Sequence, residues 1–465
     1  MVRNNLPQGR AIVIGGGIAG LLAARVLADH YQQVTLIERD CYPDEPGLRP
    51  GVPQGRQLHI FLLRGQHILN KLFPHLQKHL LEKGALPHDY GSQSLYYYRA
   101  RCQVSQRLDG WLCSRALLEW QIRQELLASY PIQLLEGYEV THLLYNAHTS
   151  FVTGIQFRTR NHGDDPALQE LAADLVVDAS GVSSRASEWL KELGCDVPQE
   201  TIVDVSLGYA SRFYASPAHR RDDLYQFISI QSAGGRRSGS LTALEGGRLE
   251  VVLAGTRGDY PPQTDEGYLA FANALPDPSL YEMIRDLKPI SPIYGYRRMA
   301  NRWRHYEQLK RFPKNLLIVG DAFCSFNPVY GQGMTVAALE SLALQACLKR
   351  MRREALSRRF HRRCARIVRM PWLLATLVDQ GMRSDDELAG AQTRGSIMRQ
   401  YMDRVTLLLA VDEHVLLVFV KIVHMLQSPL ALIYPSFLFR VLFRYDVATY
   451  MERYIKGRRA GRPPV

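Results

Sequence analysis

Three glycines near the N-terminus, Gly15, Gly17 and Gly20, have the spacing Gly-x-Gly-x-x-Gly. The apolar run Ala11–Ile14 comes directly before them, and the helix-forming run Leu21–Ala28 comes directly after them. A buried strand, a glycine turn and a helix in this order form a phosphate site, because the helix N-terminus offers free N–H groups and a partial positive charge. We expect Gly15 to permit the tight turn, Gly17 to let the backbone approach a pyrophosphate, and Gly20 to let helix and strand pack closely.

An acidic residue completes this dinucleotide-binding pattern. Val34–Ile37 is a second apolar run, and Glu38 follows it where a carboxylate accepts hydrogen bonds from an adenosine ribose. Ile18 and Ala19, at the start of the predicted helix, join the expected cofactor-binding residues. The pattern predicts a bound dinucleotide without distinguishing FAD from NAD, although its place close to the N-terminus favours FAD.

A second glycine-rich segment occurs far along the chain. Asn315–Val319 predicts a buried strand that ends at Gly320-Asp321, where the carboxylate can accept hydrogen bonds from the ribityl hydroxyls of a flavin. A loop with little side-chain bulk follows and leads into a predicted helix at Met334–Arg350. Such a loop can lie against an isoalloxazine ring, and its helix N-terminus can stabilise negative charge on the reduced flavin. The loop residues that we expect at the cofactor are Pro328, Gly331 and Gly333.

With both segments in place, the chain resembles the flavin monooxygenase superfamily with the aromatic-hydroxylase fold. Within it, the chain resembles most closely the branch of squalene-epoxidase-like and bacterial polyether epoxidases. The matching segments are Ala11–Ala24 with Glu38-Arg39, Gly51–His59, Ser114–Glu119, Leu175–Gly181 and Val319–Val336. The resemblance implies an α/β protein: a Rossmann-like FAD-binding domain, an inserted β-rich substrate domain and a C-terminal helical region.

The same resemblance implies roles for individual residues. Glu38 and Arg115 would contact the adenosine and pyrophosphate side of FAD, and Asp321 would hold the ribityl chain. The chain has Asp178-Ala179-Ser180-Gly181 where many aromatic hydroxylases carry an Asp-Gly pair. The matching segments add three further residues to the expected cofactor site: Arg39, Arg56 and Asp178.

Composition limits the class of protein. With 465 residues and 46% hydrophobic content, the chain can bury a large core in one to three domains. The seven cysteines are odd in number and lack a Cys-x-x-Cys spacing, and no apolar leader precedes the first strand. We therefore expect reduced thiols, no metal site and a cytoplasmic protein. Cys324 lies in the second glycine-rich segment, where we expect it to fill space rather than to react.

Two later segments raise the question of a membrane. The segment 349–369 contains ten Lys or Arg residues and one acid, Glu354, and we interpret it as a solvated helix. No nucleic-acid motif accompanies this charge, so we expect no nucleic-acid partner. Val405–Tyr445 is strongly apolar, but Pro429 and Pro435 interrupt it, which disfavours a membrane-spanning helix. A helical cap over the active site is the favoured interpretation, and peripheral membrane contact is the open alternative.

The pattern of predicted elements suggests how the domains are divided. We expect Ser94–Val104 to be one strand, Trp111–Ala128 to be a helix, and Thr201–Arg304 to be rich in strands. The expected divisions are 1–93 (FAD-binding, first part), 94–110 (strand of the substrate domain), 111–200 (FAD-binding, second part), 201–309 (substrate domain), 310–350 (FAD-binding, third part) and 351–465 (C-terminal helices). No second Gly-x-Gly-x-x-Gly occurs, so NAD(P)H would bind transiently or a partner reductase would supply electrons.

No residue stands out as catalytic. His59 and His67 lie near a matching segment, but a lone histidine is more often structural. The resemblance implies an FAD-dependent monooxygenase that uses O2 and NAD(P)H to epoxidise or hydroxylate a lipophilic olefinic or aromatic metabolite through a flavin C4a-hydroperoxide, in secondary metabolism. The alternative is an FAD-dependent double-bond reductase of the geranylgeranyl-reductase type. A halogenase is disfavoured because no Trp-x-Trp-x-Ile-Pro segment occurs, and a flavin-binding protein without turnover is the alternative outside enzymes.

Overall fold

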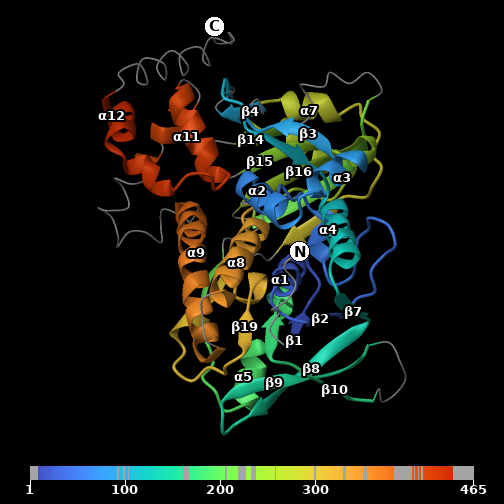
Figure 1. The fold of residues 1–465 in the computed structure, drawn as a ribbon. Helices are drawn as coiled ribbons and strands as arrows, with labels where there is room; N and C mark the ends of the chain where they lie inside the picture. Colours follow the sequence, from blue (N-terminus) through green and yellow to red (C-terminus); the bar gives the residue numbers. More distant parts are fainter. Residues whose placement is uncertain are drawn as a thin grey trace, which may run out of the picture.

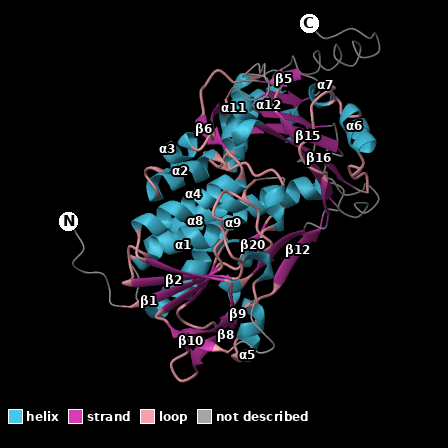
Figure 2. Ribbon diagram, turned by 90° about the vertical axis from the view of Figure 1, so that its right-hand side faces the viewer, coloured by secondary structure: helices cyan, strands magenta, loops and turns pink. Residues whose placement is uncertain are grey.

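Two large β-sheets with helices between them make up the structure (Figures 1 and 2). The computed structural model describes residues 9–91, 94–97, 100–102, 104–160, 167–204, 207–217, 227–231, 237–256, 258–297, 300–327, 331–349, 353–381, 401–402, 404–406, 408–409 and 412–443. The α/β fold class is confirmed: a parallel sheet covered by helices, a separate β-rich sheet formed from inserted segments, and a group of C-terminal helices.

The first sheet has five parallel strands assembled from distant parts of the chain. In spatial order the strands are β19 (Leu316–Ile318), β11 (Leu175–Asp178), β1 (Arg10–Ile14), β2 (Gln33–Glu38) and β7 (Ile132–Glu136). The inner strands are continuous apolar runs because both of their faces are buried. Parallel strands end at the same edge, so the two glycine-rich segments, which follow β1 and β19, meet there.

Helices cover this sheet and lie between it and the second sheet (Figure 2). α1 and α8 pack against each other, and α2 packs against α8. The helices of this layer are α1 (Ile18–Leu27), α2 (Leu63–Leu72), α3 (Leu76–Glu82), α4 (Arg115–Ser129) and α8 (Gly333–Leu348). α5 (Ala186–Glu192) lies on the other side of the parallel sheet (Figures 1 and 2). The apolar side chains of these helices share one core with the parallel sheet.

The second sheet has seven strands in the order β17-β13-β16-β15-β14-β4-β5. Its strands are β4 (Ser94–Tyr97), β5 (Ala100–Cys102), β13 (Leu207–Ala215), β14 (Phe227–Gln231), β15 (Arg237–Leu244), β16 (Arg248–Thr256) and β17 (Tyr294–Arg297). One face packs on α6 (Asp265–Asn273) and α7 (Ser279–Ile284) through a separate apolar cluster. The opposite face sends polar side chains toward the helical layer, at Tyr209 and Ser211.

Smaller sheets complete the fold. One has the order β10-β9-β8, another β12-β18-β20, and a third pairs β3 with β6. Their strands are β3 (Leu86–Asp89), β6 (Asp109–Leu112), β8 (Tyr138–Asn146), β9 (Phe151–Thr159), β10 (Gln169–Ala172), β12 (Glu200–Asp204), β18 (Ala300–Arg304) and β20 (Cys324–Ser325). Cys324 is buried in the main core, as expected of a residue that fills space.

Two predicted elements differ from the structure. The single strand expected at Ser94–Val104 is a hairpin of β4 and β5, paired antiparallel. The helix expected from Trp111 begins only at Arg115, because Trp111 lies in β6 and pairs with Pro87 of β3. The side chain of Ser114 accepts the Leu117 N–H at 3.2 Å, and this N-cap sets the true start of the helix.

The C-terminal helices are α9 (Arg353–Gly381), α11 (Glu413–Val423) and α12 (Pro435–Phe443), with a 3-10 turn at Pro429–Ile433 between the last two. α9 packs against α8 and buries its apolar side chains in the main core, whereas α11 and α12 form a second apolar cluster against α2. In α9, Phe360, Cys364 and Val368 are buried, whereas Arg358, Arg362 and Arg366 are exposed, as expected for a solvated helix face. Among the described residues, no helix has the length and apolarity required to traverse a bilayer.

Candidate functional site

A cleft of about 270 Å³ opens at the edge where the strands of the parallel sheet end. Both glycine-rich segments contribute to its walls, together with the loop after β2 and the start of α4. The predicted cofactor residues that line it are Gly15, Gly17, Ile18, Ala19, Glu38, Arg39, Arg115, Asp321, Gly331 and Gly333. The fold therefore brings together residues that are separated by most of the chain.

The other predicted residues lie elsewhere. Gly20 packs behind the glycine turn, and Pro328 falls outside the described residues. Arg56 is exposed and does not line the cleft; its guanidinium lies 5.4 Å from the centre of the Tyr294 ring on β17. Asp178 is fully buried beneath the cleft and does not line it either.

Asp178 has its acceptor capacity used within its own turn. Its Oδ1 accepts hydrogen bonds from the Ser180 N–H at 2.9 Å and from the Ser180 hydroxyl, and its Oδ2 accepts from the Ser184 hydroxyl at 2.6 Å. Burial raises the pKa of Asp178, and these hydrogen bonds oppose that rise. The residue therefore orders the turn after β11, which carries Ala179, Ser180 and Gly181 to the cleft wall.

The glycines of the first segment have distinct geometric reasons to be glycine. Gly15 has a φ of +95°, which strongly favours glycine, and an added Cβ would lie 2.6 Å from the carbonyl oxygen of Ala179. A Cβ on Gly20 would lie 1.8 Å from the carbonyl oxygen of Gly15. Gly17 differs, because its added Cβ would meet nothing within 4 Å. Gly17 also precedes α1 without a side-chain cap, so the first N–H groups of that helix face the cleft without a side-chain partner from the N-cap.

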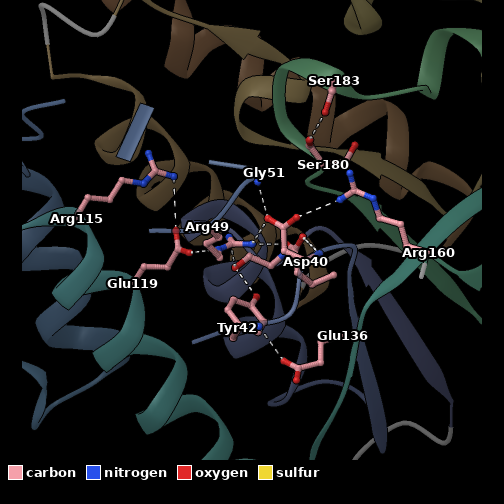
Figure 3. A network of polar contacts seen from close by, with 12 residues as sticks. Asp40, Tyr42, Arg49, Gly51, Arg115, Glu119, Glu136, Arg160, Ser180 and Ser183 are labelled. Carbon is pink, nitrogen blue, oxygen red and sulfur yellow. Dashed lines mark hydrogen bonds and ion pairs between the residues drawn. The ribbon is translucent and has the colours of Figure 1, made fainter. Parts of the chain in front are cut away.

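A buried network of charges supports the acidic residue of the fingerprint (Figure 3). The Gly16 N–H donates to Oε2 of Glu38 at 2.7 Å, and the Asp40 N–H donates to Oε1 at 3.0 Å. Arg49 forms ion pairs with Glu38 at 3.1 Å, Asp40 at 3.5 Å and Glu119 at 2.7 Å. Arg49 also lines the cleft. One guanidinium thus joins the end of β2 to α4 and fixes the carboxylate of Glu38.

Tyr42 holds the outer side of the glycine turn. Its hydroxyl donates to the Gly16 carbonyl at 2.7 Å, and its ring contacts the guanidinium of Arg49 at 4.8 Å from the ring centre. A Cβ on Gly16 would lie 1.8 Å from the Tyr42 hydroxyl oxygen. Gly16 is therefore glycine because of this contact, which the spacing of the fingerprint does not reveal.

Arg115 and His59 form a second polar pair on the cleft wall. Burial and the neighbouring Arg115 lower the pKa of His59 to about 3, so its imidazole is neutral at neutral pH. Nδ1 of His59 lies 2.7 Å from the Gln57 carbonyl, and Nε2 lies 3.3 Å from an Arg115 nitrogen. Because the carbonyl only accepts and the guanidinium only donates, Nδ1 carries the proton and Nε2 accepts. Arg115 also lies 3.6 Å from Glu119.

The second glycine-rich segment is held from behind by a buried carboxyl. The Gly320 N–H donates to Oε2 of Glu340 on α8 at 2.7 Å. Burial raises the pKa of Glu340 to about 8, and nearby Asp321 acts in the same direction. Asp321 itself is half-buried at the cleft wall, and desolvation raises its pKa although Arg115 opposes this.

Polar contacts connect the cleft to the seven-stranded sheet. The Ser211 hydroxyl on β13 donates to Gln57, and the Tyr209 hydroxyl donates to Oδ1 of Asn327 at 3.0 Å. Phe213 shares this face because side chains alternate along a strand, and Glu250 on β16 is its cross-strand partner. Glu250 is buried, and its Oε1 has no hydrogen-bond partner among the described residues.

The residues at or near this site that were not predicted from sequence include three with buried charge or a buried carboxyl: Arg49, Glu340 and Glu250. Arg49 lies within a charged loop, and its partner Glu119 is distant in sequence, so only the fold reveals the pair. Glu340 could have been noticed as an acid within an otherwise apolar helix. Glu250 could have been noticed in the same way, within the apolar strand Arg248–Thr256. The described residues hold no group of three or more His, Cys, Asp or Glu that could bind a metal.

Comparison with known proteins identifies one relative by sequence and several solved structures with a similar fold. No family model matches the chain. Protein Rv3254 of Mycobacterium tuberculosis is 33% identical over 353 residues, covering 74% of this chain and 73% of that protein. A flavoprotein/dehydrogenase from Cytophaga hutchinsonii has a TM-score of 0.64 at 12% identity, with 97% of this chain and 100% of that chain covered.

Two further solved structures share the fold. The flavin-dependent halogenase CmlS has a TM-score of 0.61 at 16% identity, with 87% of this chain and 73% of that chain covered. The probable FAD-dependent monooxygenase pqsL from Pseudomonas aeruginosa has a TM-score of 0.57 at 14% identity, with 88% and 98% covered. At these identities the likeness shows a common fold.

Proposed function

Because the chain belongs to the same family as Protein Rv3254 of Mycobacterium tuberculosis and has the fold of flavin-dependent halogenases and monooxygenases, we propose that it is an FAD-dependent oxidoreductase of the monooxygenase kind. The observation that carries this proposal is the cleft itself. Its walls combine the glycine turn, Glu38, Asp321 and the glycine loop before α8.

The residues present fit FAD. The space in front of Gly17 is open, and the first N–H groups of α1 face it, as a pyrophosphate would require. Two buried polar atoms of residues that line the cleft have no hydrogen-bond partner among the described residues: Nε of Arg115 and Oε1 of Gln332. A ligand rich in phosphate, hydroxyl and amide groups would satisfy such atoms.

Each part of the cofactor has a natural partner in this chain. The residues Gly17–Ala19 and Arg115 would hold the pyrophosphate, Glu38 the adenosine ribose, and Asp321 the ribityl chain. Gly331 and Gly333 would lie against the isoalloxazine ring. When bound, FAD supplies two-electron reduction and reaction with O2.

The surrounding residues suit an apolar substrate. Leu58, Ile60 and Phe326 line the cleft, and the seven-stranded sheet meets it through Gln57 and Asn327. The roles of this chain are then to orient the substrate, to exclude water and to hold protons on buried groups such as His59 Nδ1. We propose epoxidation or hydroxylation of a lipophilic olefinic or aromatic metabolite in secondary metabolism, as in the epoxidase branch that the sequence resembles.

Domain organisation and supply of electrons follow from the same proposal. Residues 1–93, 111–200 and 310–350 would form the FAD-binding domain, 94–110 and 201–309 the substrate domain, and 351–465 the helical region. NAD(P)H would bind transiently, or a partner reductase would reduce the flavin. The proposed location is the cytoplasm.

Purification with added FAD tests the proposal directly. We expect a yellow protein with one FAD per chain that is reduced by NADH, NADPH or a flavin reductase and reoxidised by O2. With candidate alkenes and phenols, a product labelled by oxygen-18 from O2 would support monooxygenation. A protein that cannot retain FAD contradicts the cofactor assignment. Reoxidation by an alkene without O2 would instead indicate a double-bond reductase, and a strict need for chloride or bromide would indicate a halogenase.

A further inference from the structure

The last described helix, α12, is apolar on both sides. Phe437 and Val441 are buried and pack into the cluster formed with α11. On the opposite side Phe439 is 66% exposed, Leu442 is 49% exposed and Phe443 is 57% exposed. A helix on the surface of a globular protein normally carries polar residues on its outer side. The outer side of α12 is therefore built for contact with something apolar.

Neighbouring side chains extend this surface. Leu430, Ile433 and Tyr434, from the turn before α12, are also exposed, and the rings of Phe439 and Phe443 lie 5.2 Å apart. We call the exposed side chains of these residues the apolar end face: Leu430, Ile433, Tyr434, Phe439, Leu442 and Phe443. Half of the large apolar side chains that are exposed in the described part of the chain lie within Val423–Phe443, so the surface is a concentrated patch rather than scattered residues.

The position of the patch leaves it accessible. α12 lies at the outer edge of the molecule, at the end opposite β8, β9 and β10 (Figures 1 and 2). The cluster beneath it includes Ile60 among its packed neighbours, and Ile60 also lines the cleft. The apolar cluster on which the end face rests therefore extends to the cleft wall.

Charge around the patch identifies its partner. The segment from Val423 to Phe443 contains no Asp or Glu and one Arg, Arg440. The sequence that follows, 444–465, contains six Lys or Arg residues and two acids. Exposed aromatic and aliphatic side chains, followed directly in the sequence by net positive charge, match the interfacial region and headgroups of an anionic bilayer. Tyr434 and the two phenylalanines are of the kind that favours this interfacial depth.

We propose that the apolar end face docks this protein on anionic lipid membranes. α12 has only nine residues, so it lies in the membrane surface and does not cross it. Insertion of the side chains of Phe439, Leu442 and Phe443 supplies the apolar contribution, and the basic sequence after α12 supplies attraction to anionic headgroups.

Sedimentation of the full chain with lipid vesicles tests this proposal. We expect the protein to bind vesicles of phosphatidylcholine mixed with phosphatidylglycerol more tightly than vesicles of phosphatidylcholine alone. Added salt should reduce this difference in binding, because it screens the charges. The double variant Phe439→Ser, Phe443→Ser should lower the partition coefficient about tenfold or more. The matched control is Leu168→Ser, because Leu168 is 59% exposed and directly precedes β10 in the sequence, and β10 lies at the opposite end of the molecule (Figure 1). This control should bind like the unchanged protein.

A second measurement does not depend on a loss of binding. In a Phe439→Trp variant, the added tryptophan should show a blue-shifted emission with anionic vesicles and no shift without them, after subtraction of the unchanged protein's signal. No shift, or equal loss of binding in the Leu168→Ser control, would overturn the proposal. The unchanged protein could instead sediment as a dimer, the double serine variant as a monomer, and neither could bind vesicles. That result would overturn the proposal and show that the apolar end face is an interface between two copies.

Discussion

Glu340 and Gly320 are joined by a buried hydrogen bond in which the Gly320 N–H donates to the carboxyl Oε2 at 2.7 Å. Gly320 has a φ of +61°, and an added Cβ would lie 2.7 Å from the Cβ of Ala19. The turn that presents Asp321 is therefore held between α8 on one side and the first glycine-rich segment on the other. The two segments are positioned relative to each other by direct contact, not only by the sheet.

Replacing Glu340 by alanine should weaken both the fold and flavin retention. The change leaves the Gly320 N–H without its acceptor and opens a cavity in the core, for which we expect a loss of about 2–4 kcal/mol in the free energy of unfolding. Denaturant unfolding and the flavin content after gel filtration measure the two effects. Glu340→Gln is the matched control, because its amide oxygen can still accept the Gly320 N–H. Alanine and glutamine variants that behave alike would show that the hydrogen bond does not hold the turn.

Two glycine substitutions should separate binding from folding. Gly17→Ala places its methyl group in open space, so the free energy of unfolding without cofactor should stay within about 0.5 kcal/mol of the unchanged protein. The same methyl group occupies the approach to the pyrophosphate, so FAD affinity should fall about tenfold or more. Fluorescence titration with FAD and thermal unfolding without it are the two measurements.

Gly20→Ala is the matched control for that experiment. Its methyl group would lie 1.8 Å from the carbonyl oxygen of Gly15, so the fold should lose about 2 kcal/mol or more even without FAD. If Gly17→Ala binds FAD like the unchanged protein, the cleft in front of this residue is not the pyrophosphate site.

The local part of the site could be predicted from sequence, and the part that depends on distant contacts could not. Gly15, Gly17 and Glu38 belong to one strand-turn-helix-strand unit, whose spacing alone determines where they lie. Arg49 could not be assigned in this way, because its role depends on Glu119, which only the packing of α4 brings to it. Arg56 shows the reverse case: it lies in one of the segments on which the sequence resemblance rests, yet its guanidinium packs against Tyr294 outside the cleft.

The predicted boundaries of two elements were wrong because strand pairing in the fold overrode the local sequence pattern. Trp111 and Leu112 have apolar character that suits a helix, but they pair with β3 and remain extended. The division of Ser94–Val104 into two strands also had no sequence signal, because the two residues between β4 and β5 are neither glycine nor proline. In both cases pairing with a neighbouring strand determines the backbone conformation more strongly than the intrinsic propensity of the residues does.

Removing Arg49 should be among the most damaging changes near the cleft. Arg49→Met leaves Glu38, Asp40 and Glu119 as buried carboxylates that have lost a shared partner, which should cost about 3–5 kcal/mol in the free energy of unfolding. Denaturant unfolding at neutral pH measures this loss. Arg107→Met removes the exposed pair with Asp109, which water and salt screen, and should change the free energy of unfolding far less. Equal losses in the two variants would contradict the structural importance of the buried network.

Glu250 should make the stability of the protein depend on pH. Burial raises its pKa to about 8 from an ordinary value of 4.5, with the nearby Glu245 acting in the same direction and Arg248 opposing. The folded state therefore binds this proton more tightly than the unfolded state does. The stability contributed by the protonated form is complete below about pH 4.5 and is lost as the pH rises through about 8.

Glu250→Gln removes this titration while keeping a similar shape. Compared with the unchanged protein, the variant should gain relative stability between pH 5 and pH 9, by up to about 1.4 kcal/mol per pH unit and by a few kcal/mol in total. Denaturant unfolding at several pH values gives the difference directly. The Glu340→Gln variant is a useful parallel, because burial also raises the pKa of Glu340 to about 8 and the same trend is expected. The free energy of unfolding could instead differ between Glu250→Gln and the unchanged protein by the same amount at every pH. Glu250 would then be charged in the folded state, and solvent or a cation would have to reach it.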